Sequence, residues 1–150
     1  MRRQLLFLGL TLLLANIALG QCDKQLKLKC EKATRMNADG SMGEDQDVHV
    51  DIVFSKDSIN LAVTMQDGRQ MEIHGFIREK DCKMNSAFTE GSMLAKVNGI
   101  MLRDGTEKEE KLIFTLEAKN GKFKLFGAKD VAPGADPEKM YFEIMDQKQD

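Results

Sequence analysis

The chain has no tryptophan, a single tyrosine and only two prolines among its 150 residues. Its apolar side chains are mainly aliphatic. Eight phenylalanines supply most of the aromatic rings, and methionine is abundant, with ten residues. Neither sign of charge dominates, because 22 basic residues stand against 24 acidic ones. A mildly acidic chain lacks the basic patch that attracts phosphate groups. We therefore expect no nucleic-acid partner.

Signatures of catalytic sites are missing as well. The sequence contains no GxSxG, HExxH, phosphate-loop or GxGxxG motif, each of which marks a defined chemistry. It also contains no CxxC pair, so neither a zinc site nor thioredoxin-like redox chemistry has support. These absences predict a protein that is not an enzyme and has no catalytic residues, cofactor or metal.

The first 20 residues have the layout of a secretory leader. Arg2 and Arg3 precede an apolar stretch at residues 5–14, and the small residues Ala18 and Gly20 follow. This order of charge, apolar core and small residues is typical of a cleaved signal peptide. The apolar stretch is about half the ~20 residues that a membrane-spanning helix needs.

The expected cleavage site lies directly before Gln21. A lipoprotein leader would need a small residue immediately before Cys22, where Gln21 stands. We therefore expect a signal peptide at 1–20 and one soluble, exported domain at 21–150, periplasmic or extracellular, without a stable membrane anchor. Loss of the two leader arginines would change the formal charge from -2 to -4.

Three cysteines remain after the leader, and an exported protein can form a disulfide. Cys30 continues the inward phase of a strand, which predicts a buried thiol, whereas Cys22 and Cys82 lie in polar surroundings. Cys22–Cys82 is therefore the favoured pair, and Cys30–Cys82 is the competing one. Cys22 and Cys30 are separated by eight extended residues, or about 26 Å, which disfavours their pairing.

After residue 21 the apolar residues alternate with polar ones, which is typical of strands with one buried face. Turn signals such as Asp67-Gly68 and Asn120-Gly121 separate these runs. A two-residue loop at Asn120-Gly121 and a three-residue loop at 66–68 both place inward residues opposite inward residues. Asn98-Gly99 interrupts another run and predicts a β-bulge. The predicted strands are 25–31, 47–54, 58–65, 69–77, 92–102, 110–118, 122–128 and 139–145.

Eight consecutive strands joined by short connections predict an all-β antiparallel meander. A closed or nearly closed, lipocalin-like barrel is favoured, because near-neighbour pairing suits an up-and-down barrel. A sandwich of two sheets is the alternative, since it gives the same alternation. An eight-stranded barrel can be filled by its own side chains or hold one small ligand.

The sequence contains two groups of polar residues that could form a site. His49 and His74 fall on outward positions about 16 Å apart, which is too far for a shared metal or a catalytic pair. The acidic segment at 39–47 contains oxygen ligands but lacks the spacing of an EF-hand. We expect surface histidines and a solvated loop.

Methionine is abundant, and several methionines share the inward phase with phenylalanines. Methionine is flexible and polarizable, so walls rich in it adapt to varied apolar ligands, although it also fills ordinary cores. These side chains are the expected lining of a pocket. The predicted ligand-binding residues are Val50, Phe54, Met65, Met71, Phe114 and Phe142.

The leader ending before QCDK, the short strands, the mid-chain cysteine and the segment FTEGSM (88–93) together resemble small uncharacterised exported β-proteins of Gram-negative bacteria. The plan of the chain also resembles lipocalin-like barrels, although the Gly-x-Trp of true lipocalins is missing. The resemblance implies export and an all-β fold, and it assigns no functional residues.

The sequence therefore predicts an exported binding module that carries a small apolar or amphipathic ligand inside a β-barrel. The alternative is an envelope or secreted protein-interaction or structural domain with a filled core, binding through a strand edge or loops. A cavity above roughly 300 Å³ would favour the first, and a filled interior with an exposed apolar patch would favour the second.

Overall fold

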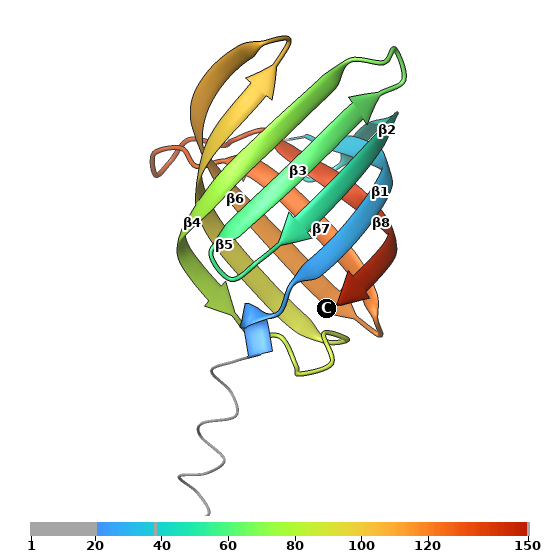
Figure 1. Cartoon of the computed structure of the whole chain (residues 1–150), viewed down its shortest axis with the longest axis vertical. Coiled ribbons are helices and arrows are strands. Elements are labelled where there is room, and N and C mark those ends of the chain that lie inside the picture. Colours follow the sequence, from blue (N-terminus) through green and yellow to red (C-terminus); the bar gives the residue numbers. More distant parts are fainter. Residues whose placement is uncertain (1–20, 38, 150) are drawn as a thin grey trace, which may run out of the picture.

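The structure, a computed structural model, describes residues 21–37 and 39–149, so the predicted signal peptide lies outside the described residues. Eight antiparallel strands follow one another around a closed barrel, and β1 pairs with β8 to complete the wall (Figure 1). The predicted meander and its closure into a barrel are thus confirmed, and the sandwich is not formed. The elements are η1 (Gln21–Asp23), β1 (Leu26–Met36), β2 (Met42–Phe54), β3 (Ser58–Met65), β4 (Gln70–Cys82), β5 (Gly91–Arg103), β6 (Thr106–Lys119), β7 (Lys122–Lys129) and β8 (Lys139–Gln149).

The alternation of apolar and polar residues places one face of every strand inside the barrel. On β2, Val50, Ile52 and Phe54 are almost fully buried, whereas His49 lies on the outer surface. Burying one such aliphatic or aromatic side chain stabilises a fold by about 1.5–3 kcal/mol. The inward side chains of all eight strands form one continuous hydrophobic core.

Both hairpin registers predicted from turn chemistry are confirmed. At the β6–β7 turn, Lys119 pairs with Lys122 and Leu116 with Leu125. Asn120 and Gly121 both have positive φ, 52° and 72°, as the two-residue turn requires. The longer β3–β4 loop pairs Val63 with Met71, as expected.

The predicted bulge at Asn98-Gly99 is wrong. Around these two residues the register of β5 runs without a shift on both sides, with Gly99 opposite Gly75 on β4 and Glu110 on β6. Gly99 therefore takes an inward position, and a Cβ there would lie 3.1 Å from Leu112 Cδ1. The glycine makes room for Leu112 rather than breaking the strand.

Several strands are longer than predicted because the alternation fades where they leave the core. β2 begins at Met42 instead of residue 47, and the extra residues are exposed. Register shifts lie elsewhere, at Ile77/Glu79 between β4 and β5 and at Lys29/Cys30 and Cys30/Lys32 between β1 and β8. Bulges of this kind bend a sheet and help it to close.

The two ends of the barrel differ. The lower end in Figure 1 carries η1, the β2–β3, β4–β5 and β6–β7 connections and the end of β8. The β4–β5 loop folds inward there, and its Met84 and Phe88 are only 5% and 2% exposed. The upper end carries the other four connections. The loop side chains thus extend the core at the lower end.

Candidate functional site

A disulfide and the hydrogen bonds of one lysine attach η1 to the lower end of the barrel. A disulfide joins Cys22 of η1 to Cys82 at the end of β4, and Cys30 is a free, buried cysteine. The favoured pairing is therefore confirmed. The Lys80 Nζ donates to the backbone carbonyls of Cys22 and Lys56 at 3.1 and 3.0 Å. These contacts hold η1 against the barrel. Burial raises the pKa of the Cys30 thiol.

The upper end has a different lining. Met71, Met101 and Met140 are inward side chains that pack on top of the core while remaining partly exposed. Met65 ends β3 at the same level and is also partly exposed. We call these four residues the methionine mouth. It presents flexible apolar surface to solvent at one end of the barrel.

Charged residues continue the inward face above the methionine mouth. Cross-strand partners share one face of a sheet, so Arg103 lies on the face of Met71 and Lys108 on the face of Met101. Glu110, 15% exposed, lies 3.4 Å from Lys129 Nζ. Its hydrogen bond to Lys108, with a smaller contribution from Lys129, lowers its pKa. The rim therefore carries both signs of charge. Arg103 lies 3.6 Å from Asp104, and Arg35 lies 3.7 Å from Glu138.

The six predicted ligand-binding residues separate into two sets. Met65 and Met71 belong to the methionine mouth, where solvent reaches them. The other four lie in the core below it, and the least buried of them is 9% exposed. Whether any of the six contacts a ligand stays a prediction. Those four buried residues are Val50, Phe54, Phe114 and Phe142.

The core below the mouth is filled by its own side chains. Ile52, Leu116 and Leu125 are 0% exposed, as expected for side chains in close contact on all sides. A ligand at this end would therefore rest on the core and displace methionine side chains, rather than enter a preformed void.

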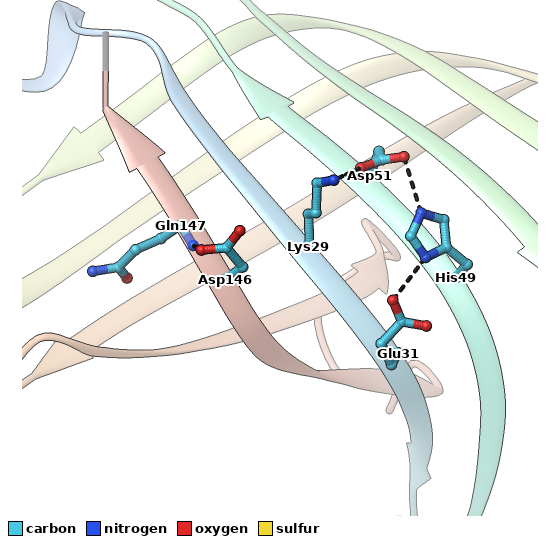
Figure 2. Close-up of polar contacts among 6 residues, drawn as sticks. All are labelled: Lys29, Glu31, His49, Asp51, Asp146 and Gln147. Carbon is cyan, nitrogen blue, oxygen red and sulfur yellow. Dashed lines mark hydrogen bonds and ion pairs between the residues drawn. The ribbon is translucent and has the colours of Figure 1, made fainter.

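Each histidine lies in a separate polar cluster on the outer wall. His49 Nδ1 is 2.8 Å from Glu31 Oε1, and its Nε2 is 3.2 Å from Asp51 Oδ2 (Figure 2). His74 lies between Asn60 and Glu72. Asn60 on β3 pairs with His74 on β4 and with Val53 on β2, and His49 lies four residues before Val53. The predicted register that separates the two histidines is therefore confirmed.

The pKa of His49 is expected to lie above its ordinary value, chiefly because of the hydrogen bond to Glu31 and then its charge. A raised folded-state pKa makes the protonated ring stabilising below the unfolded pKa of ~6.5, and this contribution is lost as pH rises through the folded pKa.

NMR titration of the His49 ring should show its pKa falling in Glu31→Gln. Glu72→Gln, beside His74, is the matched control and should leave it unchanged; an equal response to both variants would contradict the assignment.

The acidic segment at 39–47 does not converge on one point. Asp39 accepts hydrogen bonds from the backbone and hydroxyl of Ser41, whereas Asp45 and Asp47 accept from Thr34 and Gln66 on neighbouring elements. Within residues 21–37 and 39–149, no group of three or more His, Cys, Asp or Glu side chains could hold a metal ion. Most of this segment extends β2 rather than forming the expected loop.

A groove runs along the outer wall between β7 and β8. Its volume is about 890 Å³, and its lining combines inward and outward side chains, including Phe123 and the exposed Met145. It forms because β7 pairs with β8 only between Lys124–Ala128 and Lys139–Glu143. We call it the seam groove. Strand periodicity could not predict it, since both strands have ordinary patterns.

No protein-family model, curated protein or solved structure matches the chain. Across the described residues, no helix is long and apolar enough to cross a membrane.

Proposed function

We propose that the protein is an exported binding module that holds a small amphipathic ligand at the methionine mouth. The observation that carries the proposal is the asymmetry of the barrel. One end is filled by Met84 and Phe88, while the other presents partly exposed methionines above the core. Because the core itself is filled, the ligand would not lie inside the barrel as the sequence predicts, but would rest on the methionines at its open end.

The cations on the inward side of the rim would attract an anionic head group. That head would compete for them with the carboxylates of Asp104, Glu110 and Glu138. Arg103 and Lys108 share the inward face with Met71 and Met101, and Arg35 lies opposite Met140. An apolar chain would pack on the flexible thioether side chains, and its carboxylate or similar head would lie near these cations. The ligand class is thus a fatty-acid-like amphiphile.

Binding can be tested with a fluorescent fatty-acid analogue and residues 21–150 of the protein. We expect saturable binding with one probe per barrel, and native mass spectrometry should show the same adduct. Met71→Glu should weaken binding at least tenfold, because it places a carboxylate beside the anionic head and the apolar chain. Met71 is partly exposed, so we expect this variant to fold.

Met145→Glu is the matched control. It makes the same chemical change at a side chain that is 67% exposed on the outer wall, and it should leave probe binding unchanged. Equal loss in both variants would place the probe elsewhere. Failure of the unaltered protein to bind the probe or retain any apolar adduct would overturn the proposal.

A further inference from the structure

The end of β8 has an open edge. β7 begins at Lys122 and its last partner on β8 is Glu143. In the described part of the chain, residues 144 and 146–149 therefore pair with β1 alone. The other edge of this segment faces the seam groove. An unpaired edge offers backbone donors and acceptors to another strand.

Asp146 engages this edge in the single barrel. Its Oδ1 accepts a hydrogen bond of 2.8 Å from the backbone N–H of Gln147. Lys29, its cross-strand neighbour on β1, instead extends to Asp51 at 4.0 Å (Figure 2). The Gln147 N–H is thus engaged by a side chain of its own strand, and this bond is released when Asp146 rotates away.

The sequence Asp146-Gln147-Lys148 is complementary to itself in an antiparallel pair. If two copies pair about Gln147, each Gln147 faces the other, and Asp146 of each copy faces Lys148 of its partner. Opposite charges directly across two strands stabilise their pairing, and like charges oppose it. A two-fold axis through Gln147 forms this charge pair twice.

The seam groove has room for the incoming strand. Five extended residues are about 17 Å long, and with a strand spacing of about 4.8 Å and a sheet thickness of about 10 Å they fill about 800 Å³. The groove measures about 890 Å³. Met145, 67% exposed, would be covered by the same contact.

We propose that two copies of this protein associate through the open edge of β8, with Gln147 on the two-fold axis and Asp146 paired with Lys148 of the other copy. In the dimer the Asp146 carboxylate gives up its hydrogen bond with the Gln147 N–H and pairs with Lys148 of the other copy. The backbones of the two Gln147 residues then form hydrogen bonds with each other. A short edge buries less surface than a permanent interface, so the dimer is weak and concentration-dependent. This inference is independent of the methionine mouth.

The test is sedimentation velocity of residues 21–150 over a range of concentrations at low and high salt. We expect the mass to double at high concentration and the association to weaken with salt, which screens exposed charges. Asp146→Lys and Lys148→Asp should each weaken dimerisation about tenfold, because each creates two pairs of like charge. The double variant Asp146→Lys, Lys148→Asp should restore it, since the segment is again self-complementary.

Lys96→Asp is the control, because it makes the same charge change at a cross-strand ion pair with Glu79 (2.8 Å) on β4 and β5. It should leave dimerisation unchanged. A monomer at every concentration would overturn the proposal and leave the edge for an extended segment of another polypeptide. A dimer that the single variants do not weaken, or that the double variant does not restore, would place the interface elsewhere.

Discussion

Replacing Cys22 and Cys82 together by serine is expected to lower the free energy of unfolding by about 4 kcal/mol, less any strain released. The disulfide joins residues 60 positions apart, so the unfolded chain loses much of its freedom when the loop is closed. The effect acts mainly on the unfolded state, and the folded barrel should keep its secondary structure. Urea unfolding of the oxidised protein and the variant measures the difference.

Reduction supplies the control for this prediction. Treating the unaltered protein with a reductant should reproduce the loss of stability, while the same treatment of the variant should change nothing, because Cys30 is free and buried. A loss below about 1 kcal/mol would mean that the unfolded chain is already compact near these residues.

Gly91→Ala is expected to lower the free energy of unfolding by about 3 kcal/mol. Gly91 has a φ of 120°, a conformation that residues with a side chain rarely adopt. A Cβ there would also lie 2.1 Å from the carbonyl oxygen of Lys83 and 2.8 Å from Met84 Cα. These are backbone atoms of the loop that fills the lower end, so the loop itself must shift, at a cost of about 1–3 kcal/mol beyond the backbone strain.

Gly105→Ala separates the two contributions. Gly105 also has a positive φ, 75°, but no atom lies within 4 Å of the position of a Cβ. Its replacement should cost about 1 kcal/mol, the conformational part alone. Thermal or urea unfolding of both variants should therefore differ by about 2 kcal/mol, and equal losses would show that the contact with residues 83 and 84 has no energetic consequence.

Much of the barrel follows from local rules. Alternation identifies the inward face of each strand. The turn at Asn120-Gly121 determines the register, because a loop one residue longer or shorter would place Phe123 and Leu125 opposite outward residues. Gly99 shows the limit of that reasoning. A glycine in a strand can mark a bulge or make room for a neighbour, and only the position of Leu112 on the next strand distinguishes these cases.

The sites were less accessible to sequence reasoning. The grouping of methionines at one end had a signal, since Met65, Met71, Met101 and Met140 all lie near connections on the same side of the meander. The contact of His49 with Glu31 had none, because it depends on the irregular register between β1 and β2. The seam groove depends on how far two strands remain paired, which neither strand encodes alone.

Closure of the barrel by β1 and β8 determines when folding can finish. Leu26 pairs with Gln149, so the first strand remains without one of its neighbours until the last strand has emerged. Contacts between such distant segments form slowly because a long loop must close first. The strands from β1 to β7 can pair during synthesis, but the wall is completed only after β8 has been synthesised.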